Sequence, residues 1–426
     1  MSPISSTPPM ASPSSLLWTD PLRKAQFDDW FARVSQNHQL APDTLRLASA
    51  DASFRRYLRV DSAAGGVPTS LIIMDAPPDK GDCKPFANAA ELMAQAGLRV
   101  PSVLAWDEAN GFMLLTDLGT HTMKDVIQPD APPPLELYLD AVETLIQWQL
   151  ASREGVLPPY DRAFVMRELE LFPQWYIGEY RQVTLDEAQR QVLDKAFAAL
   201  ADSALSWPNV YMHRDFMPRN LMVSEGMAPT LTTACAALPP EGTVSPGGGP
   251  AAKLAPTLDT NVSSLLPEDA VSSWGAPAAK PAPLGKPSAT RLGVLDFQDA
   301  VYGPITYDIA SLLRDAFLSW EEDFCLDVTI RYWEKARKAG LPVGDDFGEF
   351  YKGVEWMGLQ RHLKIAGIFA RLSIRDGKPH YLADTPRFIA YIRTTCSRYM
   401  ELKPLLRLVE RIEGIEVPNA YAFGRT

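Results

Sequence analysis

The chain has 426 residues, 46% of them hydrophobic, and a formal net charge of −11 at pH 7. This length allows two lobes, each with a hydrophobic core of its own. The negative charge argues against nucleic acid as a partner, because binding to a phosphate backbone depends on clustered Lys and Arg. No apolar run approaches the length of a membrane span, and the first residues lack the features of a signal peptide. Together with four widely spaced cysteines, these features predict a cytoplasmic protein with reduced thiols.

The first part of the chain has the pattern of a small antiparallel sheet with two helices. Residues 1–20 are rich in Ser and Pro and are expected to be disordered, whereas Pro21–Gln36 has apolar residues at helical spacing. Asn110-Gly111 between two apolar runs is a strong signal for a β-hairpin. The other expected elements are strands Thr44–Ala48, Phe54–Val60, Leu71–Met74, Val103–Trp106 and Phe112–Leu115, and a helix at Phe86–Ala96. Residues 21–118 are therefore predicted to form an N-terminal lobe.

From residue 119 onward the apolar spacing becomes that of helices. Residues 119–225 and 291–426 are predicted to form the two parts of one mainly helical C-terminal lobe. One helix begins near Tyr307 and has an apolar stripe that runs to Phe317. The other expected helices are Leu135–Ala151, Asp186–Leu200, Phe324–Ala339, Asp345–Arg371, Pro386–Glu401 and Leu405–Ile415. The predicted fold class is α+β, a small antiparallel-sheet lobe followed by a helical lobe.

The stretch from His213 to Asn220 reads His-Arg-Asp-Phe-Met-Pro-Arg-Asn and lies between two apolar runs. It places Asp215 five residues before Asn220, on a loop that a strand closes. Phosphoryl transfer needs a carboxylate that accepts a hydroxyl proton and, close to it, an uncharged oxygen ligand for Mg²⁺. Asp215 is therefore a candidate base and Asn220 a candidate metal ligand, although Asp215 alone could also be a turn or cap residue.

A second aspartate completes this pattern. Asp296 follows the apolar run Leu292–Leu295 and precedes Phe297, as the metal-binding aspartate of a kinase does. Asp215 and Asp296 are 81 positions apart, but residues 226–290 hold eleven prolines and few large apolar side chains. Such a segment cannot offset the entropy of ordering it, so we predict a disordered insertion, with a small extra domain as the alternative. Without the insertion, the two aspartates belong to one catalytic β-hairpin.

With these motifs in place, the chain resembles the aminoglycoside phosphotransferase and choline kinase-like family of small-molecule kinases. The order of the catalytic loop, the strand before Asp296 and the helix start at Gly303-Pro304 and Tyr307–Ala310 is that of the family. Further stretches narrow the resemblance to amino-sugar kinases: Asp51–Tyr57, Ile73–Pro78, Phe112–Gly119, Arg361–Lys364 and Phe369–Leu372. The resemblance implies a two-lobed protein-kinase-like fold and transfer of the γ-phosphate of ATP to the anomeric hydroxyl of N-acetylmuramate or N-acetylglucosamine in cell-wall recycling.

The resemblance also implies roles for single residues around the reacting group. Asp215 would accept the proton of the substrate hydroxyl, and Asn220 and Asp296 would hold Mg²⁺ on the β- and γ-phosphates of ATP. Asp308 would fasten the catalytic loop from below, with helix capping as the alternative.

For the nucleotide, the resemblance implies that backbone groups of Thr116, Asp117 and Leu118 receive adenine. Arg55 is a candidate phosphate contact, and an exposed strand arginine is an equally good interpretation. The chain departs from ordinary kinases, because the strand Leu-Ile-Ile-Met-Asp has no phosphate-orienting lysine and no glycine-rich loop precedes it. Lys80 or an arginine near position 55 is expected to substitute.

For the sugar, the candidates are Glu168, Glu170 and Trp175 before the catalytic loop and Arg361 after it. An aromatic face suits a sugar ring, and a cation suits the lactyl carboxylate of a muramic acid. The alternatives are core packing for Trp175 and a solvated helix position for Arg361.

Two other functions remain open from the sequence. The first keeps the fold and changes the acceptor to an amino alcohol, homoserine or an aminoglycoside. The second is a catalytically dead nucleotide-binding scaffold, which the missing lysine and glycine-rich loop suggest. The presence of Asp215, Asn220 and Asp296 together argues against this scaffold.

Overall fold

The computed structural model of the chain describes Trp18 and residues 20–49, 55–64, 69–128, 131–224 and 291–415. The predictions of disorder for residues 226–290 and for nearly all of residues 1–20 lie outside these ranges. The described elements confirm an α+β fold with one five-stranded antiparallel sheet and a larger set of helices.

These elements divide into two compact units. The sheet unit reaches to Lys84 and includes Pro101–Gly119, and the helical unit contains Pro85–Val100, Thr120–Met222 and the described residues after 290. Residues 85–100, predicted to belong to the N-terminal lobe, are grouped with the helical unit in the structure.

The reason for this grouping lies in the contacts of residues 85–100. The ring of Phe86 stacks on that of Phe297, with centroids 4.9 Å apart. Arg99 forms a parallel β-bridge with Gly293, and its carbonyl oxygen accepts from Val294 N–H at 2.8 Å. Both contacts join this segment to the strand before Asp296.

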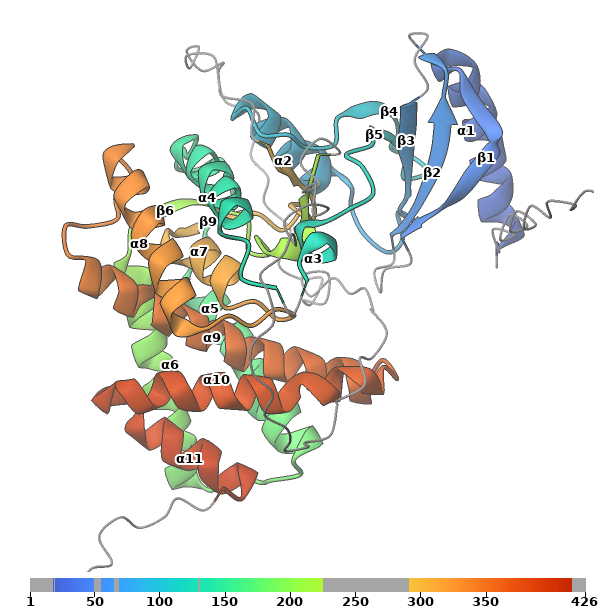
Figure 1. Cartoon of the computed structure of the whole chain (residues 1–426). Helices are drawn as coiled ribbons and strands as arrows, with labels where there is room; N and C mark the ends of the chain where they lie inside the picture. The colour runs from blue at the N-terminus through green and yellow to red at the C-terminus, as the bar shows by residue number, and fades with distance from the viewer. Residues whose placement is uncertain are drawn as a thin grey trace, which may run out of the picture. The chain divides into compact units, whose positions relative to one another are not determined.

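The sheet unit has the strand order β1-β2-β3-β5-β4, and all neighbours are antiparallel (Figure 1). The predicted turn at Asn110-Gly111 leads into β5, and Gly111 has a φ of +67°, which glycine adopts without strain. A Cβ at this position would lie 2.0 Å from the carbonyl oxygen of Ala76, so the turn requires glycine. The strands are β1 (Leu40–Ser49), β2 (Arg56–Ser62), β3 (Thr69–Asp75), β4 (Val103–Asp107) and β5 (Phe112–Thr116).

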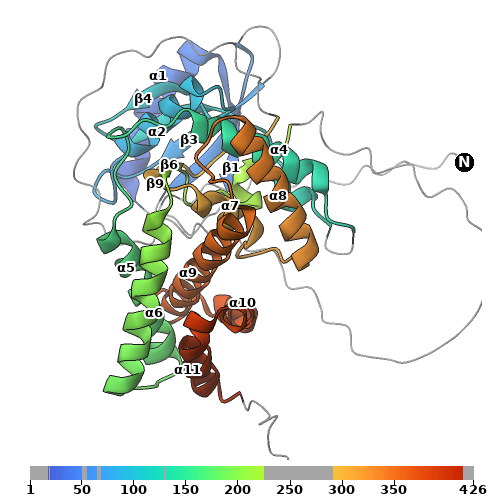
Figure 2. The ribbon, with the colours of Figure 1, turned by 90° about the vertical axis from the view of Figure 1, so that its left-hand side faces the viewer.

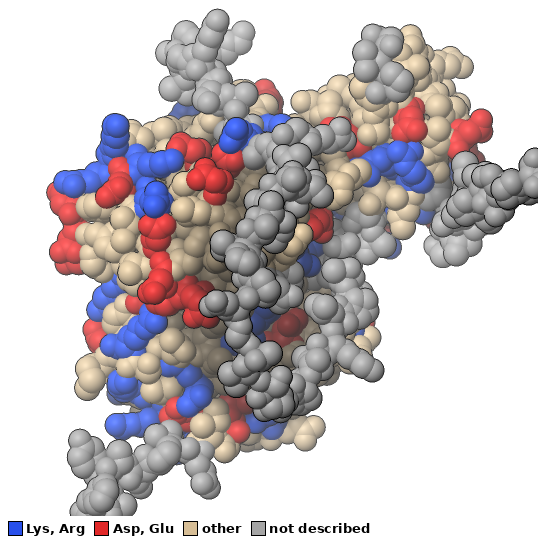
Figure 3. Space-filling model, in the orientation of Figure 1, with Lys and Arg blue, Asp and Glu red and all other residues tan. Residues whose placement is uncertain are grey.

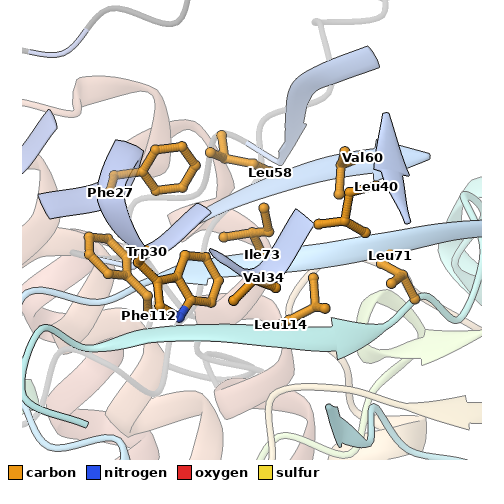
Figure 4. Packing of buried hydrophobic residues seen from close by; sticks show 10 residues of the cluster. All are labelled: Phe27, Trp30, Val34, Leu40, Leu58, Val60, Leu71, Ile73, Phe112 and Leu114. Carbon is orange, nitrogen blue, oxygen red and sulfur yellow. The ribbon is translucent and has the colours of Figure 1, made fainter. Parts of the chain in front are cut away.

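Helix α1 (Pro21–His38) packs against this sheet. It begins where Oδ1 of Asp20 accepts from Leu22 N–H at 2.9 Å, with Pro21 at the first helical position. Its buried side chains meet those of β1, β2, β3 and β5 in one core, which Figure 4 shows: Phe27, Trp30, Val34, Leu40, Leu58, Val60, Leu71, Ile73, Phe112 and Leu114. Burial of side chains of this size is worth about 1.5–3 kcal/mol each, so this core is the main stabilising contribution to the unit.

Strand β3 contains no lysine, as the sequence indicated, and it ends in a buried aspartate. The Asp75 carboxylate binds Nη2 of Arg23 at 2.6 Å and Nη2 of Arg56 at 2.7 Å. The guanidinium of Arg23 also lies 3.8 Å from the ring centroid of Phe112. The end of β3 therefore joins α1 to the sheet, because its carboxylate neutralises cations from both.

The helical unit is built around α9 (Phe347–Ile374), which has buried residues along most of its length. Figure 2 shows α9 between α6 and α10, and it also contacts α5, α7 and α8. A Cβ on Gly367 would lie 2.4 Å from the backbone of Leu171, so α9 and the end of α5 approach closely. The other helices are α2 (Lys84–Gln95), α3 (Met123–Val126), α4 (Leu135–Leu150), α5 (Arg162–Leu171), α6 (Glu187–Ser206), α7 (Thr306–Leu313), α8 (Glu322–Lys338), α10 (Thr385–Arg398) and α11 (Lys403–Glu413).

Three helices differ from the sequence-based expectation. Helices α3 and α5 were not predicted, and α5 continues into a π-helical segment, Phe172–Tyr180. Helix α7 ends at Leu313 and does not run to Phe317. The carboxylate of Asp315 accepts from Leu318 N–H at 3.1 Å, and such a side-chain bond to the backbone competes with the helical pattern.

The described helices include none that is long and apolar enough to cross a membrane. On the face drawn in Figure 3, Lys and Arg are interspersed with Asp and Glu. The three described cysteines, Cys83, Cys325 and Cys396, are buried thiols outside any disulfide, as predicted.

Candidate active site

The motif from His213 to Asn220 forms the loop between two short strands of the helical unit. The strand before it pairs with β9, and the strand after it pairs with β8, which leads to Asp296. The predicted hairpin that joins the two halves of the motif is therefore confirmed. Pro218–Asn220 forms a 3-10 turn. The strands are β6 (Asn209–Met212), β7 (Leu221–Met222), β8 (Gly293–Val294) and β9 (Val301–Pro304).

Asn220 connects the two aspartates. Its Nδ2 donates to the backbone oxygen of Asp215 at 2.9 Å and to Oδ2 of Asp296 at 3.3 Å. Its own carbonyl oxygen accepts from Leu295 N–H at 2.9 Å, which sets the register of the hairpin beside Asp296. The other carboxylate oxygen of Asp296 accepts from Gln298 Nε2 at 2.6 Å. The side chains that the sequence placed 76 positions apart, Asn220 and Asp296, are thus in contact.

The residues of this site fit a divalent cation. Burial and the nearby charge of Asp215 raise the pKa of Asp296 to about 7. A cation relieves such repulsion between carboxylates, and amide and carboxylate oxygens are the ligands that Mg²⁺ prefers. Within the described ranges no three His, Cys, Asp or Glu side chains form a complete metal site. Asn220 and Asp296 are therefore suited to the kind of site in which one or two protein ligands share the cation with substrate phosphates.

The backbone of the loop is held by Asp308 of α7. Its Oδ2 accepts from His213 N–H at 2.7 Å and its Oδ1 from Arg214 N–H at 2.9 Å. Helix capping, the alternative interpretation, is wrong, because α7 is capped at Ile305 without a side-chain bond. Arg214 has a φ of +77°, and a non-glycine residue in this region costs about 1–3 kcal/mol. The bonds to Asp308 stabilise this strained backbone.

The imidazole of His213 joins the loop to the neighbouring strand. Its Nδ1 accepts from Asp215 N–H at 3.2 Å, and its Nε2 lies 3.0 Å from the carbonyl oxygen of Leu295. These partners assign the proton to Nε2. Burial lowers the pKa of His213 to about 4, so the ring is neutral near pH 7. His213 thus fixes the backbone next to Asp215 without adding a charge.

Beneath the loop, Glu168 of α5 is fully buried and binds two cations. Its Oε1 accepts from Lys364 Nζ at 2.6 Å and from Arg214 Nη2 at 2.9 Å. Its Oε2 accepts from Tyr160 Oη at 2.6 Å and from Gln360 Nε2 at 2.9 Å. Burial opposes ionisation, but Lys364 and Arg214 more than offset it and lower the pKa of Glu168 to about 2. The Glu168 carboxylate therefore links the Arg214 side chain to α5, which carries Glu168, and to α9, which carries Lys364.

In the sheet unit, Thr116–Leu118 includes the end of β5 and the two residues after it. The Asp117 carboxylate binds Nε of Arg59 at 2.6 Å and accepts from Ser70 Oγ at 2.7 Å. It also accepts from Gly119 N–H at 2.9 Å. Burial opposes its ionisation, but these partners lower the pKa of Asp117. The segment is therefore held by its own central side chain, and the role of its backbone toward adenine stays a prediction.

Arg55 lies directly before β2 and is 8% exposed. Its interpretation as an exposed strand arginine is therefore wrong. Its role as a phosphate contact stays a prediction.

Of the four residues predicted for the sugar, Glu168 is fully buried with its carboxylate bound by protein groups, and the other three lie on separate helical elements. Glu170 forms an ion pair with Arg190 of α6, and Trp175 lies half-buried in the π-helical segment. Arg361 is 2% exposed, so its interpretation as a solvated arginine is wrong, and its Nη1 donates to the carbonyl oxygen of Arg214 at 2.7 Å. Of the three, Arg361 touches the catalytic loop, from its buried side. Their roles toward a sugar stay predictions.

Sequence reasoning did not single out Lys364 or Gln298. The burial of Lys364 could have been predicted, because it lies between the apolar residues Leu363 and Ile365 on a helix that is apolar on most sides. Gln298 follows Asp296 by two residues, and this spacing alone does not predict a contact between their side chains.

The chain is similar in sequence to known phosphotransferases and kinases. A family model described as the phosphotransferase enzyme family matches residues 44–230 and 287–346. The N-acetylmuramate/N-acetylglucosamine kinase of Neisseria meningitidis serogroup B is 39% identical over 396 residues, which are 92% of this chain and 97% of that one. The protein of the same name from Pseudomonas aeruginosa is 40% identical over 89% of this chain and 91% of that one. Among solved structures, the GDP complex of aminoglycoside 2'-phosphotransferase-IIIa gives a TM-score of 0.48 at 11% identity, over 87% of this chain and 99% of that one.

Proposed function

Because the chain belongs to the phosphotransferase enzyme family, we propose that it transfers the γ-phosphate of ATP to the anomeric hydroxyl of N-acetylmuramate and N-acetylglucosamine, with Mg²⁺. Enzymes of this kind use a nucleoside triphosphate and a divalent cation in general. The proposal rests on one observation, the convergence of Asp215, Asn220 and Asp296 on one hairpin. The names of the two relatives indicate the acceptor. The proposed setting is the cytoplasm, where ATP is available and thiols stay reduced.

In this proposal Asp215 acts as the general base. Its carboxylate takes the proton of the C1 hydroxyl while the sugar oxygen forms a bond to the γ-phosphorus. The bond from that phosphorus to the bridging oxygen of ATP breaks, and ADP leaves. An anomeric hydroxyl is more acidic than an ordinary alcohol, so a carboxylate suffices as the base. Asn220 and Asp296 would hold Mg²⁺, which supplies positive charge to the phosphate oxygens.

The remaining contribution is positioning. Asp308 and His213 fix the backbone on both sides of Arg214, and Glu168 fixes its side chain. The base is therefore part of a rigid loop before substrate binds. Such preorganisation is a large part of catalysis in phosphoryl transfer, because the protein does little covalent chemistry.

The test is Asp215→Asn, assayed for sugar 1-phosphate formation and, separately, for ATP binding and folding. We expect turnover to fall by at least about 10²–10⁴-fold, the usual contribution of a general base, with folding and ATP binding nearly intact. Asp194→Asn, on the surface of α6, is the matched control and should keep wild-type turnover. Near-normal turnover in Asp215→Asn would refute the assignment.

The acceptor is tested with a panel of small alcohols. N-acetylmuramate and N-acetylglucosamine should give the highest kcat/KM, with the new phosphate on the C1 oxygen. Choline, homoserine and an aminoglycoside serve as comparison acceptors. A higher kcat/KM for any of these would move the proposal to that acceptor class.

A further inference from the structure

One side of the catalytic loop carries a cluster of two cations around an aromatic ring. Arg219 lies between Asp215 and Asn220 in the loop, and its guanidinium carbon is 5.0 Å from the ring centroid of Phe317. Nζ of Lys124, on α3, is 5.2 Å from the same centroid. These three residues, which we call the Arg219 cluster, all belong to the helical unit.

The backbone that carries Phe317 is firmly held. Asp315, two residues earlier, is buried, and its carboxylate accepts from Leu318 N–H at 3.1 Å. Arg387 of α10 donates to the carbonyl oxygen of Ala316. The irregular segment after α7 is therefore anchored through its backbone on both sides of Phe317.

Helix α3, which carries Lys124, is fixed in a similar way. Thr122 and Asp125 form a reciprocal capping box at its start. Thr122 also forms an antiparallel bridge with Met222, the strand residue that follows the catalytic loop by two positions. Both cations of the cluster are thus attached to the hairpin that carries Asp215.

The charge of the cluster is positive. Within the described part of the chain Lys124 makes no ion pair, and it is half-buried over the ring. Arg219 lies close enough to Asp296 to favour its ionised form. Two cations beside one ring offer an anion two charged donors, and the exposed part of the half-buried ring offers a sugar an apolar surface.

We propose that the Arg219 cluster is the acceptor subsite that recognises the carboxylate of N-acetylmuramate and so sets the preference between the two sugars. This inference rests on the proposed function. N-acetylmuramate carries a lactyl carboxylate on O3, which N-acetylglucosamine lacks. Arg219 binds this carboxylate, Lys124 adds a second charge, and the sugar ring packs against Phe317.

The rival role for these cations is binding of the phosphates of ATP. The two roles predict different kinetics. A phosphate contact affects both sugars equally and changes the KM for ATP. A carboxylate contact affects one sugar and leaves the KM for ATP unchanged.

The experiment measures kcat and KM for both sugars at saturating ATP in the wild type, Arg219→Gln and Lys124→Gln. We expect Arg219→Gln to lower kcat/KM for N-acetylmuramate by about 10-fold to 100-fold, mainly through KM, as for a lost charged hydrogen bond. Because Arg219 also acts on Asp296, both sugars share whatever Arg219→Gln costs at the metal site, and the readout for this variant is the ratio of kcat/KM between the two sugars. In Lys124→Gln, N-acetylglucosamine and the KM for ATP should change by less than about threefold. The methyl ester of N-acetylmuramate should lose no more than N-acetylglucosamine does in either variant, because it has no charge to recognise. Arg331→Gln, on the surface of α8, is the control.

Equal losses for both sugars, or a raised KM for ATP in Lys124→Gln, would overturn this inference and leave the proposed function intact. If the wild type phosphorylated neither sugar, the proposed function would fail. In that case, calorimetric measurement of how tightly each sugar binds still tests the acceptor subsite without relying on turnover. Weaker binding of N-acetylmuramate but not of N-acetylglucosamine to Arg219→Gln supports the subsite, and equal binding to both proteins excludes it. Lys124→Gln provides the same test if Arg219→Gln does not fold.

Discussion

Replacement of Glu168 by Gln tests whether the buried charges beneath the catalytic loop stabilise the fold. The substitution keeps the shape of the side chain and removes its charge. Lys364 and Arg214 would then remain buried next to a neutral amide. In the wild type, Nζ of Lys364 is 2.6 Å and Nη2 of Arg214 is 2.9 Å from Oε1 of Glu168. Removing one partner of a buried ion pair costs about 3–5 kcal/mol, because the remaining charge is left without compensation.

This loss is a large share of the free energy of unfolding, which is about 5–15 kcal/mol for a typical domain. With an m-value of about 3 kcal/mol per M urea, it lowers the urea midpoint of the helical unit by about 1–2 M. The matched control is Glu170→Gln, two residues away on the same helix. Its ion pair with Arg190 is 40% and 38% exposed, and such surface pairs are worth about 0–1 kcal/mol.

The assay is urea unfolding of the wild type, both single variants and Glu168→Gln with Lys364→Met. In the double variant the destabilisation should be smaller than the sum of the single effects by about 1–3 kcal/mol, because the pair is removed together. The pKa of Glu168 is lowered to about 2 from an ordinary value of 4.5, so its stabilisation is complete above pH 4.5. It is lost as the pH falls from 4.5 toward 2. If Glu168→Gln shifted the midpoint no more than Glu170→Gln does, this reasoning would be wrong.

Gly367→Ala should destabilise the helical unit by at least about 1–3 kcal/mol, because the new Cβ would lie 2.4 Å from the Leu171 backbone, and the two helices must separate. Gly348→Ala, at the start of the same helix, is the control for thermal unfolding, and equal midpoints would contradict the close approach. Burial lowers the pKa of His362 to about 3, below its ordinary 6.5, so the unfolded chain binds the extra proton and stability falls as the pH drops below 6.5. In His362→Phe the urea midpoint should therefore decrease less between pH 7 and pH 5 than in the wild type, and an unchanged pH dependence would exclude this role.

The sequence by itself determined those features whose causes are local. The Asn110-Gly111 turn was predictable because a glycine with positive φ is a local requirement. The spacing of Asp215 and Asn220, with Asp296 after a short apolar strand, was enough to identify the loop and its hairpin. Apolar spacing likewise predicted most helices, since it reports which face is buried. Helix α5 was not predicted, because its apolar face continues into an irregular π-helical segment.

Only the tertiary structure decided which charged side chains meet. Glu168 and Lys364 are 196 positions apart, and nothing in the spacing of either one indicates the other. The burial of Arg361, predicted as a sugar ligand, and the position of Phe317 beside Arg219 depend equally on how α7 and α9 pack beneath the loop. Electrostatic partners are set by distances across packed helices, whereas turns and helices are set by neighbours along the chain.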